Sequence, residues 1–511
     1  MSNERSKFYM GIDTGTHETK GILLDGEGKI ICTVSVAHEI ENPKENYFEC
    51  DAQKVMWEDL CAVSRKLLSK SGVSGDRVAA LGISVMGPDI ICVDENCNPL
   101  RKAILYGIDA RATEEIQALN AYYGEQKAKE LYGHVICSDD GAPKILWIKN
   151  NEPEIYNATY KFLTGTSFTC AKLTGNYYID KFLARADYKP LYDERAEISE
   201  ECAFYCRKDQ LAEAKWAHCC AGHIPPEAAI QTGLSVNTLV SVGTGDSAAE
   251  AISCGITESG TMMLQLGSTM YMYYCADKNI VSEKVHGGSF VVPDTYKVSA
   301  ATNAAGLLTR FIRDTLFEDF KEAEAQGGTN AYEAMAKAAE NMEPGSGGLL
   351  MLPYITGERD PVQDPKALGM MLGLKLEHKR EHIYHAALEA VAFSAKQLIQ
   401  AIEEHDLPVE KIFVSGGGVK NTLWMQILSD VLGKKLYTCS KGGGAAYGDA
   451  LLAMLCTGAI SGYGDLERFI TVDRVYEPDA AKNEKYDKYF SVYNRLYENN
   501  AALMHELADI E

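Results

Sequence analysis

One short pattern occurs twice in this chain: an apolar run, a turn with glycine and hydroxyl residues, and a second apolar run. The first copy, KFYMGIDTGTHETKGILL, spans residues 7–24, and the second, TMMLQLGSTMYMYY, spans residues 261–274. Two strand-like runs joined by a glycine turn predict a β-hairpin. A hairpin of the same kind in each half of the chain indicates two turns that could face each other across a cleft. The alternative for the second copy is an ordinary hairpin.

Strand-like runs alternate with helix-like periods along the rest of the chain, which is typical of an α/β architecture. At 511 residues the chain exceeds one ordinary core, so two domains are expected. We expect strands at 8–12, 21–24, 29–36 and 78–87, helices at 52–70 and 381–404, a strand, a glycine turn and a helix within 411–433, a small-residue helix at 442–458, and a C-terminal surface helix after about residue 475.

Composition excludes several classes of protein. Hydrophobic residues make up 46% and charged residues 24%, as in soluble globular proteins, and the sequence contains no 18-residue apolar run. The polar start, residues 1–7, leads us to expect no signal peptide. The net charge of −22 argues against nucleic acid and anionic membranes as partners. Fifteen cysteines without a CxxC pair indicate reduced, mostly buried thiols in a cytoplasmic protein, with a metal site as the alternative.

The first turn holds a carboxylate, Asp13, between Gly11 and Gly15. Strand packing gives no reason for a charge there, whereas a phosphate and metal site does. Gly15 lets the backbone approach a ligand closely, Thr16 offers a hydroxyl and an amide, and Lys20 supplies a positive charge. Asp13 could hold Mg²⁺ directly or through water. The alternative is a hairpin in which Asp13 caps backbone amides.

A second candidate, VGTGDSAAEAISCG at 242–255, places Asp246 just before an alanine-rich helix. Asp246 either caps that helix or acts as a general base that takes a proton from an attacking hydroxyl.

A third, SGGGVKN at 415–421, presents Gly416, Gly417 and Gly418 ahead of a helix, where bare backbone amides and the helix dipole favour an anion. Asn421 fits the N-cap of that helix.

A fourth, YGIDARA at 106–112, places Asp109 and Arg111 two residues apart. They either bracket the hydroxyls of a sugar or form an ion pair at the start of a helix. His378 and His382 lie four residues apart, but no carboxylate completes a metal site with them.

Seven segments, in this order, resemble motifs of the FGGY carbohydrate kinases, with the xylulokinase branch the most similar. The resemblance extends from about Phe8 to Gly458 and rests on residues 10–21, 82–112, 143–154, 243–251, 264–269, 347–374 and 415–433.

The resemblance implies a two-domain α/β fold of the actin/hexokinase/Hsp70-like (ribonuclease H-like) type with an interdomain cleft. Residues 1–256 would form the sugar-binding domain with the first phosphate motif, and residues 257–511 the nucleotide-binding domain. It implies ATP and Mg²⁺ as cofactors, and phosphorylation of a ketose such as xylulose, or of a related pentulose or polyol. Dimers are common in the family, so the resemblance is compatible with a homodimer, but the sequence identifies no interface.

The resemblance also assigns site residues. Asp13 would hold the metal and phosphates, with Gly15, Thr16 and Lys20 beside it, and Asp246 would be the general base. The remaining assignments are Gly267, Ser268 and Thr269 for the γ-phosphate side, Gly416, Gly417, Gly418 and Asn421 for the nucleotide, and Met86, Gly87, Tyr106, Asp109 and Arg111 for the sugar side.

Departures from the branch leave the identity of the sugar open. The chain has Met86-Gly87-Pro88 where the branch usually has Met-His-Gly, Tyr106 in place of Trp, and Ser247 in place of Asn. It also lacks the Asn-Gln-Arg-Glu loop of glycerol kinases. Alternatives are a kinase for another polyol such as glycerol or erythritol, an inactive relative, and an ATP-gated, chaperone-like binding protein of the same superfold.

Overall fold

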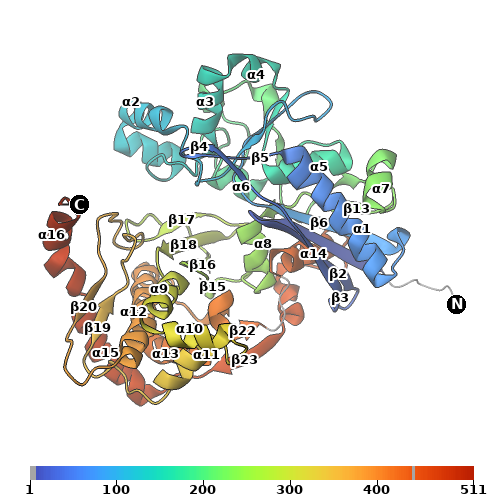
Figure 1. Ribbon diagram of the computed structural model, residues 1–511. Coiled ribbons are helices and arrows are strands. Elements are labelled where there is room, and N and C mark those ends of the chain that lie inside the picture. Colours follow the sequence, from blue (N-terminus) through green and yellow to red (C-terminus); the bar gives the residue numbers. More distant parts are fainter. Residues whose placement is uncertain (1–6, 440–443, 511) are drawn as a thin grey trace. The chain divides into compact units, whose positions relative to one another are not determined.

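The computed structural model describes residues 7–439 and 444–510 (Figure 1). The described residues fall into two compact units. Unit 1 comprises those within Met1–Thr257, Gly288–Thr295 and Gly442–Ile470, and unit 2 comprises those within Glu258–Gly287, Tyr296–Lys441 and Thr471–Glu511. The chain therefore returns to unit 1 near its C-terminus. The expected boundary at residue 256, and the roles assigned to the two halves, stay predictions.

The main sheet of unit 1 has the order β12-β13-β6-β1-β2-β3, and β14 pairs with β6. Its strands are β1 (Phe8–Thr14), β2 (Glu18–Asp25), β3 (Ile30–Ala37), β6 (Val78–Val85), β12 (Cys220–His223), β13 (Leu239–Ser241) and β14 (Thr244–Gly245). β1 and β2 are antiparallel, as are β2 and β3, whereas β6 runs parallel to β1. The first hairpin and the strand at 78–87 are thus confirmed.

Glycines on β1, β2 and β6 let helices approach the two faces of this sheet closely. A Cβ on Gly11 would lie 1.9 Å from the carbonyl oxygen of Ala446, and one on Gly82 would lie 1.9 Å from that of Asp449, both in α14 (Ala445–Cys456). A Cβ on Gly21 would instead meet Val63 in α1 (Asp59–Ser71). Because side chains alternate along a strand, α14 and α1 lie on opposite faces.

The other elements of unit 1 are small sheets and helices. They are the small sheets β4 (Glu41–Lys44), β5 (Tyr47–Cys50) and β8 (Ala103–Ile104); β7 (Ile91–Val93) and β9 (Lys161–Leu163); β10 (Tyr178–Asp180) and β11 (Glu213–Lys215); and the helices α2 (Thr113–Tyr132), α3 (Gly141–Asn151), α4 (Pro153–Ala158), α5 (Gly165–Thr174), α6 (Lys181–Ala186), α7 (Pro226–Thr232) and α8 (Asp246–Ser253).

The sheet of unit 2 repeats the pairing of the first. Its order is β17-β18-β16-β15-β21-β22-β23. β15 is antiparallel to β16 and parallel to β21, as β1 is to β2 and β6. The second hairpin is therefore confirmed, together with its place in a sheet like the first. The strands are β15 (Thr261–Leu266), β16 (Met270–Ala276), β17 (His286–Ser289), β18 (Tyr296–Thr302), β21 (Lys411–Ser415), β22 (Leu436–Cys439) and β23 (Val472–Tyr476).

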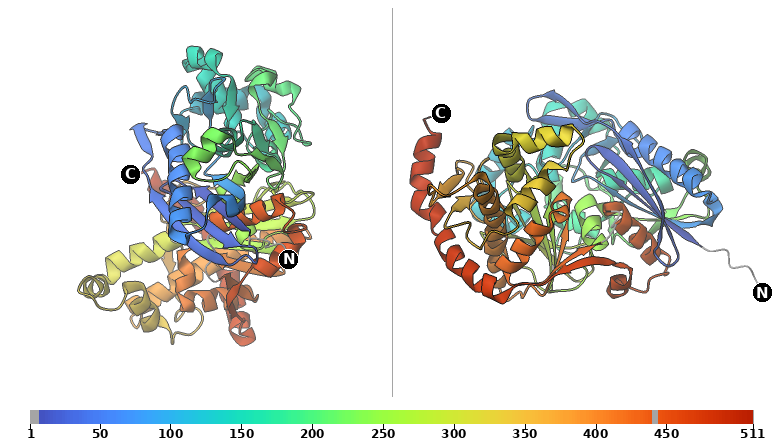
Figure 2. Two further views of the ribbon diagram at one scale, coloured as in Figure 1. Left: turned by 90° about the vertical axis from the view of Figure 1, so that its right-hand side faces the viewer. Right: turned by 60° about the horizontal axis from the view of Figure 1, so that its bottom comes forward.

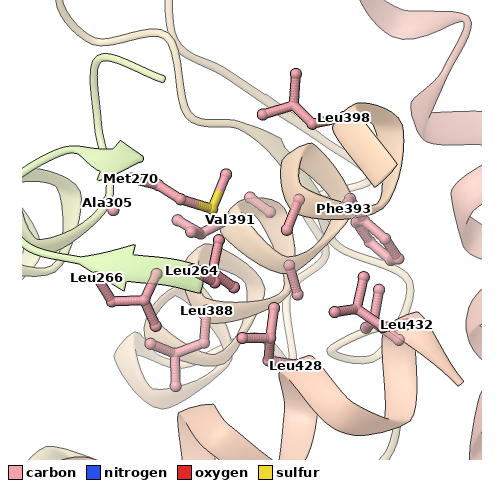
Figure 3. Packing of buried hydrophobic residues seen from close by; sticks show 14 of the residues in the cluster. Leu264, Leu266, Met270, Ala305, Leu388, Val391, Phe393, Leu398, Leu428 and Leu432 are labelled. Atoms are coloured by element: carbon pink, nitrogen blue, oxygen red, sulfur yellow. The ribbon is translucent and has the colours of Figure 1, made fainter. Parts of the chain in front are cut away.

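The core of unit 2 forms between this sheet and two helices, α12 (Arg380–Glu403) and α13 (Thr422–Leu432). Figure 3 shows Leu264 and Leu266 of β15 facing Leu388 and Val391 of α12 and Leu428 of α13. The remaining elements of unit 2 are α9 (Gly306–Leu316), α10 (Glu318–Ala325), α11 (Ala331–Ala339), β19 (Leu350–Leu352), β20 (Met370–Leu372), α15 (Ala480–Tyr493) and α16 (Leu496–Ala508).

Several expected helices differ in extent from those observed. The helix expected at 52–70 is a π-helical turn, Gln53–Glu58, followed by α1. The helix expected at 442–458 is α14, and Gly442 and Gly443 lie outside the described residues. The prediction of a single C-terminal helix was wrong, because two successive helices, α15 and α16, lie along the margin of unit 2 (Figure 2). They also contribute to the core, since Phe490 and Tyr493 of α15 are buried.

Within the described ranges, no helix combines the length and the apolar character that crossing a membrane requires. All fifteen cysteines are free thiols, and most of them are buried, as expected.

Candidate active site

A chain of hydrogen bonds joins three elements on the α14 face of unit 1. Asp13 on β1 and Ser84 on β6 are register partners on neighbouring parallel strands. They point to the same face as Gly11 and Gly82, two residues earlier on each strand. Ser84 Oγ lies 2.9 Å from Asp13 Oδ1 and 2.7 Å from Asp449 Oδ2. The close approach of α14 thus brings Asp449 to the candidate phosphate strand.

One of these two carboxyl groups must be protonated for both bonds to form, because Ser84 carries a single hydroxyl hydrogen. Asp449 is fully buried, and burial raises its pKa well above the usual range. Its Oδ1 is buried without a hydrogen-bond partner among the described residues. We therefore assign the proton to Asp449, which donates to Ser84, while Ser84 donates to Asp13.

The strand register also places Asp246 beside this network. Thr244 on β14 pairs with Ser84 on β6, and Ser84 pairs with Asp13 on β1. Adjacent strands lie about 4.8 Å apart, so Asp13, Ser84 and Thr244 form a row across three strands. Asp246 follows Thr244 by two residues and is the first residue of α8. The two carboxylates singled out in the sequence thus lie at the same end of one sheet.

Asp246 is half-buried, and its Oδ1 accepts a hydrogen bond of 2.7 Å from the backbone N–H of Ser247. Burial raises the pKa of Asp246 to about 7, and the neighbouring Asp13 carboxylate adds to this effect. Thr244, two residues earlier, is held in place by two hydrogen bonds: its hydroxyl donates to Asp180 (2.6 Å), and its carbonyl accepts from the Thr166 hydroxyl (2.7 Å). A carboxyl group with a pKa near neutrality on a fixed backbone is suited to proton transfer.

The turn of the first hairpin contacts the segment that carries YGIDARA. Thr16 Oγ1 lies 3.0 Å from the hydroxyl oxygen of Tyr106. Gly15 closes the turn by donating to the carbonyl of Glu18. Lys20 is half-exposed, and its Nζ lies 3.0 Å from Glu18 Oε1. Lys20 is also the register partner of Asp13 on the neighbouring strand, and its positive charge acts to lower the pKa of Asp13.

Asp109 and Arg111 form a buried ion pair. The two Arg111 nitrogens Nη2 and Nε lie 2.7 Å and 2.9 Å from Asp109 oxygens, and the backbone N–H of Phe48 donates to Asp109 as well. The Arg111 guanidinium also bonds Glu49 and lies over the ring of Tyr47. The Asp109 carboxylate and the Arg111 guanidinium, which were expected to bracket a sugar, are therefore hydrogen-bonded to each other and to neighbouring protein groups. A direct contact of either side chain with a sugar stays a prediction.

Asp89 and Lys144 are site candidates that the sequence reasoning missed. Asp89 lies two residues after Gly87, and its Oδ2 is buried without a hydrogen-bond partner among the described residues. Burial raises the pKa of Asp89 well above its usual range, and the charge of Asp246 acts in the same direction. Lys144 is buried and donates to the carbonyls of Leu105 and Tyr106. Burial lowers the pKa of Lys144 to about 8.

Unit 2 contains the candidate nucleotide residues. Gly267, Ser268 and Thr269 form the exposed turn between β15 and β16. The carbonyl of Gly267 accepts the backbone N–H of Gly306, and that of Ser268 accepts the N–H groups of Ala305 and Leu307, where α9 begins.

The three glycines at 416–418 lie against the same strand end. Gly416 has φ 88°, and a Cβ on it would lie 2.6 Å from the carbonyl oxygen of Leu266, the last residue of β15. Asn421 is the N-cap of α13, as expected, because its side chain accepts the N–H of Trp424 at 3.1 Å. Unit 2 therefore brings its two predicted nucleotide motifs together.

The region 347–374, which resembles a family motif, contains none of the predicted site residues. Glu358 lies there, buried, with Oε1 accepting the backbone N–H of Asn303 at 2.8 Å. Its Oε2 is buried without a partner among the described residues, and burial raises the pKa of Glu358 to about 7. Nδ1 of His378 accepts the backbone N–H of Lys375, and Nδ1 of His382 accepts that of Lys379.

The residues around Asp13 fit a divalent cation. Asp13 is buried, and burial raises its pKa to about 6, so the ionised form lacks solvation. The nearby Asp449 Oδ1 is also without a partner, as described above. Carboxylate oxygen is the ligand that Mg²⁺ prefers in phosphate sites.

The fold defines a two-unit α/β class of protein, and sequence comparison identifies the family. The N-terminal domain of the FGGY family of carbohydrate kinases matches residues 8–253, and the C-terminal domain of that family matches residues 253–456. The chain belongs to the FGGY family of carbohydrate kinases.

Relatives of known name extend over nearly the whole chain. The xylulose kinase of Staphylococcus epidermidis is 27% identical over 509 residues, covering 98% of each chain. The gluconokinase of Bacillus subtilis is 26% identical over 513 residues, covering 97% of each. Among solved structures, the xylulose kinase of Rhodospirillum rubrum has a TM-score of 0.88 at 24% identity, covering 98% of this chain and 100% of that one. That likeness confirms the two-domain α/β kinase fold.

Proposed function

We propose that this protein transfers the γ-phosphoryl group of ATP to a hydroxyl group of a sugar, with Asp246 as the general base. The observation that carries the proposal is the row of Asp13, Ser84 and Thr244 across β1, β6 and β14, with Asp246 immediately beyond it. Phosphoryl transfer to an alcohol uses one carboxylate that binds a metal ion and a second that accepts the hydroxyl proton. Asp13 and Asp246, at one end of the sheet, are suited to these two tasks.

Asp246 would accept the hydroxyl proton as the oxygen attacks phosphorus. The anchoring of Thr244 by Asp180 and Thr166 holds the start of α8 in place, so the base needs little reorganisation. The other Asp246 oxygen, Oδ2, would face the substrate, because Oδ1 is engaged by Ser247 N–H.

Asp13 would hold Mg²⁺, whose chemistry when bound is to neutralise charge on the phosphates. Ser84 orients the Asp13 carboxylate, and neutral Asp449 orients Ser84. Gly15, Thr16 and Lys20 would lie beside the phosphates. In unit 2, Gly267, Ser268 and Thr269 would contact the γ-phosphate side, and Gly416, Gly417, Gly418 and Asn421 the nucleotide.

The sugar would lie on unit 1 near Met86, Gly87 and Tyr106. Asp109 and Arg111 would hold the 105–111 segment in shape through their ion pair, with Lys144 fixing its carbonyls. In this proposal unit 1 binds the sugar and unit 2 binds the nucleotide.

A ketose such as xylulose is the first candidate substrate, since relatives named xylulose kinase cover nearly the whole chain. Gluconate is the second, because a gluconokinase is similar to the same extent. The replacement of the usual histidine by Gly87 is the reason to test both, together with glycerol and erythritol. A homodimer and a cytoplasmic location also stay predictions.

A coupled assay of ADP release over ketopentoses, gluconate and polyols tests this function. Stimulation by one compound, with a sugar phosphate as product, supports the kinase. Slow ATP hydrolysis that no compound changes would favour the ATP-gated, chaperone-like alternative.

A further inference from the structure

We propose that His134, Cys137 and Asp140 form a binding site for a divalent transition-metal ion, with Zn²⁺ the expected occupant. The three residues lie in the turn between α2 and α3, outside the candidate active site. One ligand atom from each, a ring nitrogen, the thiol sulfur and a carboxylate oxygen, lies within 4.8 Å of the other two. Nitrogen, sulfur and oxygen together are a ligand set that Zn²⁺ accepts and Mg²⁺ does not favour.

The tautomer of His134 directs a lone pair into this group. His134 Nδ1 lies 2.8 Å from the carbonyl oxygen of Val135, and a carbonyl can only accept, so Nδ1 carries hydrogen. In the neutral ring, Nε2 is therefore unprotonated, and it faces Asp140 Oδ1 at 3.4 Å. Two acceptors face each other unless a proton or a metal ion lies between them. A histidine whose Nδ1–H is held by a carbonyl is the usual arrangement for a metal ligand.

The distance between these two atoms matches a tetrahedral site. Zn–N and Zn–O bonds of about 2.0–2.2 Å place two such ligands roughly 3.3–3.5 Å apart. The observed separation is 3.4 Å. The sulfur of Cys137 needs a shift of at most the order of 1 Å to reach its position, because Zn–S bonds are about 2.3 Å long. A water molecule would complete four-fold coordination.

The turn is held in shape without a metal. Asp140 Oδ2 accepts the backbone N–H of Cys137 at 2.9 Å, and the side chain of Asp140 is only 1% exposed. The Asn120 side chain bonds both backbone groups of Ile136. A preformed group of ligands binds a metal ion with less ordering of the chain than a mobile loop would need.

This site borders the proposed sugar segment. Ser138 Oγ donates to the carbonyl of Gly107 at 2.9 Å, and a Cβ on Gly107 would lie 1.9 Å from Asp139 Oδ1. A bound ion would therefore fasten the turn that supports residues 105–111. The metal site itself does not depend on the proposed kinase function.

Co²⁺ titration of the chelator-treated full chain tests the site, because thiolate coordination gives Co²⁺ an ultraviolet charge-transfer band. We expect one equivalent of Co²⁺ to produce the band, Zn²⁺ to displace it, and excess Mg²⁺ to leave it unchanged. In Cys137→Ser the band should be absent. In His134→Asn affinity should fall by at least the roughly 10–100-fold that loss of an outer-shell partner costs.

Cys220→Ser is the matched control, since Cys220 is exposed and lies in another group of neighbouring thiols with Cys219 and Cys456. This control should keep the full band. The proposal is overturned if wild type gives no band, or if the band survives in Cys137→Ser; its loss in Cys220→Ser would then assign the band to the other group of thiols. Because the His134 side chain is 40% exposed, His134→Asn provides the same test through affinity should Cys137→Ser fail to fold.

Discussion

Ser84 Oγ and Asp449 Oδ2 lie 2.7 Å apart although 365 residues separate them in the chain. Both belong to unit 1, which α14 joins from near the C-terminus. The contact exists because Gly11 and Gly82 allow α14 to lie directly on β1 and β6. Through Ser84, a residue of the C-terminal region orients Asp13 on the first strand.

A neutral Asp449 makes the stability of unit 1 depend on pH in a definite direction. Its pKa in the folded protein is raised by burial, so wild type loses stability as pH rises above the unfolded value near 4. Asp449→Asn removes this titration and can still donate to Ser84. We expect the variant to gain thermal stability relative to wild type between pH 5 and pH 8, measured by thermal unfolding without Mg²⁺ or nucleotide. An ionised Asp449 would give the opposite trend.

The hydrogen bond between Thr16 and Tyr106 should couple the phosphate hairpin to the sugar segment. Tyr106→Phe and Thr16→Val should each raise the KM for the sugar. The double variant should raise this KM little more than either single variant does. The expected coupling is about 0.5–1.5 kcal/mol, the net value of one hydrogen bond. Tyr160→Phe, in a half-exposed part of unit 1, serves as the control. Fully additive effects would show that the two segments act independently.

Asp246 should set the acid limb of the pH–rate profile. A general base must be unprotonated, and burial with the Asp13 charge raises the pKa of Asp246 to about 7 in the ligand-free protein. We therefore expect kcat/KM to fall about tenfold per pH unit below this value. Bound Mg²⁺ should shift the limb to lower pH, since it offsets the Asp13 charge. The residual activity of Asp246→Asn should lack this limb, and a limb unchanged in that variant would assign it to another group.

Local sequence patterns predicted the parts of this protein that depend on neighbouring residues. The two hairpins, the strand carrying Ser84 and the N-cap role of Asn421 all follow from turn glycines, apolar runs and capping chemistry. The family motifs then indicated the kinase fold, which the structural comparison confirms.

The missed residues depend on contacts between distant parts of the chain. Asp449 lies within an apolar helix pattern, and nothing local shows that its backbone meets Gly82. From the sequence alone, Lys144 is indistinguishable from an exposed lysine. In the structure it is buried and donates to the carbonyls of Leu105 and Tyr106. A polar residue flanked by small or apolar residues, as in YGDALLA and PKILW, was the only available signal.

Single-turnover transfer of labelled γ-phosphate from ATP to the sugar identified by the coupled assay tests the central claim most directly. Asp246→Asn should reduce the transfer rate by about 10²–10⁴-fold, the usual contribution of a general base, while binding the sugar and keeping its circular dichroism spectrum. Glu227→Gln, which also removes a carboxylate from the first turn of a helix in unit 1, should transfer at the wild-type rate. Wild-type transfer by Asp246→Asn would contradict the proposed mechanism.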